Sequence, residues 1–319
     1  MKITQRDTNP FKFSDTNKRY HTYDYFMKRR YGGKCAKIPL DGGFTCPNID
    51  GRCGVGGCIY CSGRGSGDFA QPAEMPITEQ FKITAESLSS KWKTDKYIAY
   101  FQAHTNTYAP VSVLREKFEE ALKIKGVVGL NVATRADCLP PDVVKYLAEL
   151  SSRTDLTVEL GLQTVNDDVA RYINRGHTFE EFCKGYARLR SASDKIMTCV
   201  HLIFGLPGET PEHMLESVRQ VAKLKPNQVK IHLLHVIEGT KLAQIYRAGE
   251  YTPMDRELYI ETVCRALRLL PAETVIGRLT GDGAPDTLLA PEWSRKKVAV
   301  INDIDKMMFG RNWIQGDQI

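Results

Sequence analysis

The stretch Cys46-Pro-Asn-Ile-Asp-Gly-Arg-Cys-Gly-Val-Gly-Gly-Cys-Ile-Tyr-Cys61 holds four of the chain's nine cysteines and four glycines within sixteen residues. Glycine lets the backbone turn tightly, so several thiolates on such a loop suit a metal ion or an iron–sulfur cluster. Cys58 and Cys61 have a common ligand spacing, but no second Cys-x2-Cys pair or His-x3-His follows to complete a structural zinc site. Three protein ligands would leave one coordination position of the metal or cluster open, which is typical of a catalytic site. A zinc knuckle or reduced structural thiols are the simpler alternatives.

The third ligand beside Cys58 and Cys61 is either Cys46 or Cys53. Eleven residues separate Cys46 from Cys58, and four separate Cys53 from it. Spacing alone leaves both open.

Composition predicts one large domain, because 319 residues with 42% hydrophobic content can bury a deep core. No 18-residue apolar run and no apolar leader is present in the sequence, so we expect no membrane span. The odd number of cysteines, four of them in one loop, favours a reducing cytoplasm over a disulfide framework.

Positive charge is concentrated at the start of the chain. Residues 1–40 hold ten Lys and Arg against three Asp, a sum of +7, whereas the whole chain carries +6. The segment from Lys18 to Tyr31 interleaves basic residues with tyrosines, which suits phosphates and unpaired bases. The alternative is an amphipathic helix whose tyrosines pack on the body of the protein. The excess of positive charge over residues 1–40 leads us to expect a polyanionic partner.

Beyond residue 35, short β-branched runs alternate with helical stretches. The expected strands are residues 36–40, 96–102, 127–133, 156–162, 196–204, 229–234 and 274–279. The expected helices are residues 78–92, 111–124, 141–150, 178–189, 210–224, 241–248 and 255–270, with a closing helix after Pro291.

Six or seven such β/α units predict an α/β fold with a parallel sheet, as a partial or full TIM-like (β/α) barrel. The expected parts are a basic aromatic N-terminal arm over residues 1–34, the barrel over 35–280 and a C-terminal helical extension over 281–319. An open doubly wound sheet is the alternative, but no Gly-x-Gly-x-x-Gly follows the first strand.

Polar residues follow almost every expected strand, where active sites of parallel β/α folds lie. Singly, each has a simpler explanation: His201 and His232 suit core histidines, and Gly205-Leu-Pro-Gly208 suits a turn. Together they suit a ligand with carboxylate, amine, hydroxyl and purine groups.

The cysteine loop resembles the cluster loop of radical S-adenosylmethionine (SAM) proteins of the YtqA/YhcC type, with Cys-Pro-Asn-x-Asp-Gly followed by Gly-Gly-Cys-Ile-Tyr-Cys. Glu159-Leu-Gly-Leu-Gln163, Ile173-Asn-Arg-Gly-His177 and Gly205-Leu-Pro-Gly-Glu-Thr210 resemble later motifs of that barrel. The stretch from Lys230 to Thr240 is similar to the radical SAM domain of the elongator catalytic subunit, a tRNA wobble-uridine enzyme. We expect no room for that subunit's acetyltransferase domain.

The resemblance implies a site. It makes Cys46, Cys58 and Cys61 the ligands of a [4Fe–4S] cluster, with Cys53 a spectator, and it leaves the fourth iron to SAM. By matching positions, the implied SAM-binding residues are Tyr60 beside the adenine, Asn106 and Thr107 at the amino group, and Thr134, Arg135 and Glu159 or Gln163 at the carboxylate and ribose.

The implied function is an oxygen-sensitive cytoplasmic radical SAM enzyme that forms a 5′-deoxyadenosyl radical. The expected reaction converts 5-carboxymethylaminomethyluridine to 5-aminomethyluridine at the wobble position of tRNA, with flavodoxin or ferredoxin as reducing partner. One alternative is a radical SAM or haem-handling protein that acts on a small molecule. The other is a non-enzymatic zinc-bearing RNA-binding protein.

Overall fold

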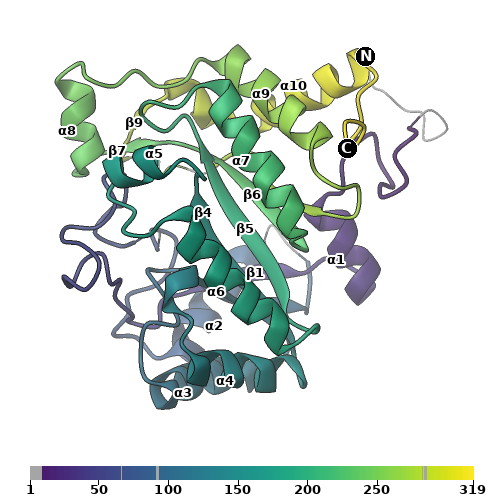
Figure 1. The fold of residues 1–319 in the computed structure, drawn as a ribbon. Helices are drawn as coiled ribbons and strands as arrows, with labels where there is room; N and C mark the ends of the chain where they lie inside the picture. The colour runs from purple at the N-terminus through teal and green to yellow at the C-terminus, as the bar shows by residue number, and fades with distance from the viewer. Residues whose placement is uncertain (1–8, 66, 91–92, 282, 284–285) are drawn as a thin grey trace. The chain divides into compact units, whose positions relative to one another are not determined.

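The computed structural model describes residues 9–65, 67–90, 93–281, 283 and 286–319 (Figure 1). The chain divides into two units. Unit 1 comprises Met1–Arg30, Gln163–Ile173 and Val200–Ile319, and unit 2 comprises Tyr31–Leu162 and Asn174–Cys199. The four cysteines of the glycine-rich loop all belong to unit 2.

The main sheet consists of β1 (Ala36–Leu40), β2 (Tyr97–Phe101), β3 (Val127–Thr134), β4 (Asp155–Gln163), β5 (Met197–Phe204), β6 (Gln228–Leu233) and β8 (Val275–Arg278). The strand order is β1-β2-β3-β4-β5-β6-β8, and the pairs β1–β2, β2–β3, β3–β4 and β6–β8 are parallel. Because β1 and β8 are at the two ends of this order, the sheet is open. An open sheet agrees with a partial barrel, one of the two expected forms. A second sheet, which the sequence did not predict, pairs β7 (Val236–Ile237) with β9 (Leu288–Ala290).

The α-helices of the described residues are α1 (Tyr23–Tyr31), α2 (Ile77–Ser89), α3 (Val111–Leu122), α4 (Pro141–Ser151), α5 (Asp167–Tyr172), α6 (Phe179–Ala192), α7 (Pro211–Leu224), α8 (Lys241–Arg247), α9 (Arg256–Arg268) and α10 (Lys297–Gly310). The expected helices are confirmed to within three residues at each end, although residues 91 and 92 lie outside the described part. Thr178 and Glu181 form the expected capping box at the start of α6. No helix in the described part of the chain has the length and apolar character needed to cross a bilayer.

The strands β1 to β4 of unit 2 have one apolar face. Side chains alternate along a strand, and Ile38, Leu130 and Val158 of this face have exposed fractions of 0%. Helices cover this face: the ring of Phe101 lies 4.8 Å from the ring of Phe118 in α3, and α3 is flanked by α2 and α4 (Figure 1). Burial of each large apolar side chain contributes about 1.5–3 kcal/mol. The opposite face of the same strands carries the polar side chains of Lys37, Tyr100, Asn131 and Glu159 beside small and apolar ones.

The segment from residue 9 to residue 30 packs within unit 1. Phe11 and Tyr20 are buried. The backbone N–H of His21 donates to Oε1 of Gln315 at 2.9 Å, and the N–H of Ile276 in β8 donates to the carbonyl of His21 at 2.7 Å. The described part of the expected arm thus has no helix before α1, but contacts with β8 and the C-terminal residues hold it. Residues 1–8 of the expected arm lie outside the described residues.

Candidate functional site

The cysteine loop follows β1 in unit 2 and consists of tight turns. The carbonyl of Cys46 accepts a hydrogen bond from the N–H of Ile49 at 2.8 Å, and the carbonyl of Cys58 accepts one from the N–H of Cys61 at 3.0 Å. Gly57 has a φ of 74°, a left-handed conformation that favours glycine. The loop therefore returns on itself between its first and last cysteines.

Two thiols of this loop, those of Cys58 and Cys61, influence each other, and the charge of Cys46 acts on Cys61. The hydrogen bond to Cys61 and the charge of Arg175 together lower the pKa of Cys58 to about 6, against the effect of burial. The same hydrogen bond raises the pKa of Cys61, and burial and the charges of Cys58 and Cys46 add to that rise. A thiolate is the form that binds metal. In this group Cys58 is the thiol that most readily becomes a thiolate, and Cys61 is close enough to feel the charges of both Cys58 and Cys46.

Cys53 has different surroundings. It is exposed, and its Sγ lies 3.8 Å from Oδ2 of Asp137. Burial of the thiol and the charge of Asp137 raise the pKa of Cys53. Cys46 and Cys53 thus differ in their surroundings, and the choice of Cys46 as the third ligand stays a prediction.

Two asparagines hold the loop in place. The amide of Asn174 donates to the carbonyl of Gly57 at 2.7 Å and to that of Val55 at 3.1 Å. The amide of Asn48, which is fully buried, donates to the carbonyl of Asn174 and approaches Sγ of Cys58 at 3.7 Å. Asn174 adopts a φ of 55°, which asparagine tolerates better than most residues. The sequence motif around residue 174 is thus a clamp on the cysteine loop.

Two glycines make this clamp possible. A Cβ at Gly54 would lie 2.3 Å from Oδ1 of Asn48, and a Cβ at Gly176 would lie 2.6 Å from the same atom. Gly176 also has a φ of 77°. A side chain at either position would force the amide of Asn48 to move from its contacts with Asn174 and Cys58.

Arg135 connects the clamp to β3. Its guanidinium donates to both carboxylate oxygens of Asp137, at 2.9 and 2.7 Å, and to the carbonyl of Arg175 at 2.7 Å. Arg175 in turn donates to the carbonyl of Gly161 near the end of β4. Arg135 therefore binds protein groups in this structure, and its expected contact with the SAM carboxylate stays a prediction.

Asn106 fits a bound amine. Its amide donates to the carbonyls of Ala103 and Ala133 at 2.9 and 2.8 Å, while its buried Oδ1 has no partner among the described residues. A buried acceptor without a donor is costly, and the amino group of SAM would supply that donor. The residues present therefore fit the cofactor at this position.

Thr107 and Thr134 form a pair that the sequence did not reveal. Their hydroxyl oxygens lie 2.5 Å apart, and the hydroxyl of Thr107 also donates to the carbonyl of Cys138 at 2.6 Å. Both side chains are buried. The pair joins the ends of β2 and β3, and its contact with SAM stays a prediction.

Glu159 lies at the centre of a polar cluster on the polar face of β1 to β4. Its Oε1 accepts from Nζ of Lys37 at 3.0 Å and from the amide of Asn131 at 2.7 Å, and its Oε2 accepts from the hydroxyl of Tyr100 at 2.9 Å. Sequence reasoning selected Glu159 but missed its three partners. Their signal was present as polar residues at alternate positions of otherwise apolar strands.

Tyr60 and Gln163 complete the expected set. Tyr60 is half-buried in unit 2; burial and the neighbouring Cys58 raise its pKa well above the usual value. Gln163 is the last residue of β4, has a φ of 75° and belongs to unit 1. Their roles at SAM stay predictions.

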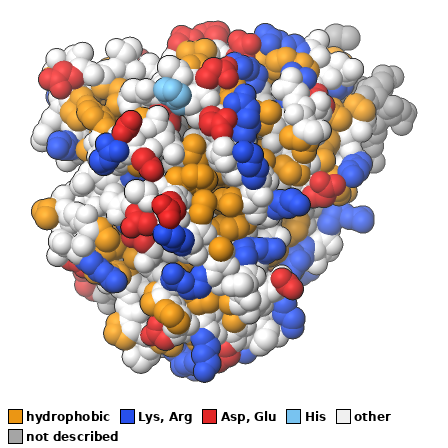
Figure 2. Space-filling model, viewed as in Figure 1, with side chains coloured by type: hydrophobic (Ala, Val, Ile, Leu, Met, Phe, Trp, Pro, Cys, Tyr) orange, Lys and Arg blue, Asp and Glu red, His pale blue; other side chains and the backbone are white. Residues whose placement is uncertain are grey.

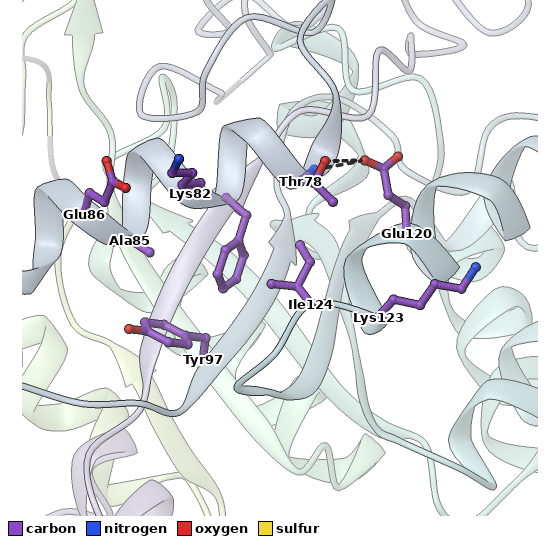
Figure 3. Close-up of a pocket in the computed structure, with 9 residues that line it drawn as sticks. Thr78, Lys82, Ala85, Glu86, Tyr97, Glu120, Lys123 and Ile124 are labelled. Atoms are coloured by element: carbon purple, nitrogen blue, oxygen red, sulfur yellow. Dashed lines mark hydrogen bonds between the residues drawn. The ribbon is translucent and has the colours of Figure 1, made fainter.

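A surface pocket of about 450 Å³ lies between α2 and α3 (Figure 3). Phe81, Tyr97 and Ile124 contribute its apolar side chains, and Thr78 hydrogen-bonds to Glu120 at its edge. It shares no residue with the cysteine loop or the Glu159 cluster.

Comparison with known proteins adds family matches over two regions. The family model of the radical SAM superfamily matches residues 49–221, and that of the radical SAM C-terminal domain matches residues 226–309. The first match begins after Cys46, so it does not decide between Cys46 and Cys53.

Relatives align over different lengths. The chain is 47% identical to YtqA of Bacillus subtilis over 97% of this chain and 95% of that protein. It is 35% identical to YhcC of Escherichia coli over 92% and 93%. It is 31% identical to the tRNA uridine(34) acetyltransferase of Methanocaldococcus jannaschii over 51% of this chain and 31% of that protein.

Among solved structures, the Elp3 protein of Methanocaldococcus infernus is similar with a TM-score of 0.66 at 19% identity. The match covers 88% of this chain and 64% of the Elp3 chain. At this identity the likeness shows the fold alone, and it agrees with the expected partial barrel.

Proposed function

Because the chain belongs to the radical SAM superfamily, whose members use a [4Fe–4S] cluster and SAM, we propose that Cys46, Cys58 and Cys61 are its cluster ligands. The observation that supports this choice is that the thiols of Cys58 and Cys61 are hydrogen-bonded and the charge of Cys46 acts on Cys61, while Cys53 contacts Asp137. When bound, the cluster and SAM supply a 5′-deoxyadenosyl radical that removes a hydrogen atom from a C–H bond of the substrate.

The chain's own residues hold these groups and keep them in position. The clamp of Asn48 and Asn174 fixes the loop, and Oδ1 of Asn106 accepts from the SAM amino group. Arg135 fixes the clamp through the carbonyl of Arg175. Enzymes of this superfamily need a reductant, and we propose flavodoxin or ferredoxin for this role.

We further propose that the substrate is tRNA with 5-carboxymethylaminomethyluridine at the wobble position. The named relative that acts on tRNA uridine(34) supports this choice, as does the basic last turn of α1, where Arg29 and Arg30 are exposed. Figure 2 shows Lys and Arg side chains exposed in the region of α1. Such groups neutralise phosphates.

The proposed reaction breaks the bond between the amine nitrogen and the carboxymethyl carbon. Water is consumed, the nucleoside keeps the amine as 5-aminomethyluridine, and the carboxymethyl group leaves as glyoxylate. SAM accepts the two electrons and becomes methionine and 5′-deoxyadenosine, with release of one proton.

The test is anaerobic incubation of the reconstituted protein with SAM, dithionite and tRNA bearing the carboxymethylated nucleoside. We expect 5-aminomethyluridine, glyoxylate and 5′-deoxyadenosine in equal amounts by mass spectrometry. Unchanged nucleosides beside 5′-deoxyadenosine formation would reject the tRNA substrate and leave the cofactors in place. A colourless protein that keeps zinc and no iron after reconstitution would reject the enzyme itself.

A further inference from the structure

The cluster around Glu159 offers a binding site for a substrate group that the cofactors do not explain. Lys37, Tyr100, Asn131 and Glu159 come from four neighbouring strands of unit 2 and share one face of the sheet. In the strand register, Tyr100 stands opposite Asn131. The other face of the same strands is apolar. Polar side chains gathered on one face indicate that this face meets a polar ligand.

The contribution of a buried ion pair to folding stability does not by itself explain why the pair is present. The side chain of Glu159 is 0% exposed and that of Lys37 is 22% exposed. Removal of a carboxylate from water costs several kcal/mol, and a pair of this kind commonly contributes less to stability than apolar residues of equal volume would. The pair therefore points to a role in binding.

The two charged partners are held differently. Two neutral donors, Tyr100 and Asn131, fix the carboxylate of Glu159. Lys37 is a partly exposed ammonium on a flexible stem, and it also lies 5.0 Å from the centre of the Tyr100 ring. Glu159 thus provides a fixed anion, and the ammonium now beside it marks the place of a cation.

We propose that this pair binds the zwitterionic arm of the substrate, an inference that rests on the proposed function. The ammonium of the arm takes the place beside Glu159, and Lys37 moves to the arm's carboxylate. The arm of the carboxymethylated nucleoside carries one positive and one negative group, and Lys37 and Glu159 offer one partner of opposite charge for each.

Contacts within unit 2 connect this cluster to the cysteine loop. Glu159 stands two residues before Gly161, whose carbonyl accepts from Arg175. The neighbouring Asn174 holds the loop at Gly57. An arm bound at Glu159 is therefore bound on the scaffold that also positions the cluster loop.

The test measures binding of three tRNAs that differ only at position 34: carboxymethylaminomethyluridine, aminomethyluridine and uridine. The reconstituted protein is used without reductant, so that no SAM is consumed. Loss of the carboxylate contact should weaken binding of the aminomethyl form about 10- to 100-fold relative to the carboxymethylated form, the range for a charge-assisted hydrogen bond. Lys37→Met should reduce that ratio to about two or less.

Glu159→Gln should weaken both amine-bearing tRNAs by a similar factor and leave the uridine form unchanged. Lys145→Met, on the exposed surface of α4, is the matched control and should keep the wild-type ratio. Since either single variant leaves one charge without its partner, Lys37→Met/Glu159→Gln provides a neutral pair, and it should bind all three tRNAs alike with full iron content.

The outcomes separate the two proposals. If the wild-type protein neither converts nor distinguishes the three tRNAs, the proposed substrate is wrong and the pair has no such ligand. If it converts the carboxymethylated form and Lys37→Met keeps the wild-type ratio, the enzyme stands and this inference is overturned.

Discussion

The side-chain amide of Asn174 donates a hydrogen bond to the carbonyl of Gly57, with 2.7 Å between nitrogen and oxygen. The two residues are 117 positions apart in the chain. The bond joins the segment before α6 to the glycine-rich loop immediately before Cys58. The position of the thiols therefore depends on a residue that is neither a thiol nor a neighbour in sequence.

Replacement of Asn174 by aspartate should loosen the cysteine loop. The carboxylate has the size of the amide but no donor, and it would face the carbonyls of Val55 and Gly57. Loss of these bonds should cost about 1–3 kcal/mol, so iron should leave to a chelator roughly ten times faster or more. The decrease of the cluster's absorbance near 400 nm measures the loss of iron.

Asn312→Asp is the matched control, because Asn312 also has a positive φ, of 51°, and its Oδ1 accepts from Arg19. An aspartate keeps that acceptor. If both variants release iron at the wild-type rate, Asn174 does not hold the loop.

Alanine at Cys46 and alanine at Cys53 should have different effects. Cys46 acts electrostatically on Cys61, whereas Cys53 faces Asp137. We expect Cys46→Ala to lose the [4Fe–4S] spectrum and Cys53→Ala to keep about four irons per chain, the content of one such cluster. The reverse pattern of iron content would make Cys53 the third ligand.

Stability should fall as the pH rises through neutrality because of Glu209. Burial raises the pKa of Glu209 to about 7, against the hydrogen bond from Thr164 at 2.5 Å. A carboxyl with a raised folded pKa holds its proton in the folded state and loses it in the unfolded state. Its contribution is therefore lost as the pH rises from the unfolded pKa through the folded pKa of about 7, and it changes little once both states are ionised.

Between pH 6 and pH 8 this group alone should reduce the free energy of unfolding by about 1 kcal/mol, roughly the equivalent of one pKa unit. Anaerobic urea titrations at the two pH values measure it. Glu209→Gln removes the ionisation and should remove that part of the pH dependence. An unchanged dependence would place the titrating group elsewhere.

Arg29→Gln/Arg30→Gln should weaken tRNA binding. Both residues are exposed in the last turn of α1. Loss of one or two phosphate contacts should reduce the slope of log K against log salt by about 0.7 to 1.8. Arg171→Gln/Lys184→Gln removes two exposed charges elsewhere on the surface and is the matched control. Equal slopes for the two double variants would show that α1 does not contact the phosphates.

The sequence predicted the elements well where local signals decide them. Proline and threonine at the start of α7, the capping box of α6 and the alternation along β1 are properties of neighbouring residues. The small sheet of β7 and β9 was missed, because strands of two and three residues are too short to show a period.

The cysteine loop and the parallel sheet could be read from the sequence alone, because a ligand spacing and a hydrophobic period are written in consecutive residues. The family could be read from the resemblance of its motifs. Tertiary structure decided which side chains hold that loop and which surround Glu159. Asn174 meets Gly57, and Lys37 meets Glu159, across 117 and 122 positions. Hydrogen bonds depend on distance in space, and only the folded strands bring such residues within 3 Å of one another.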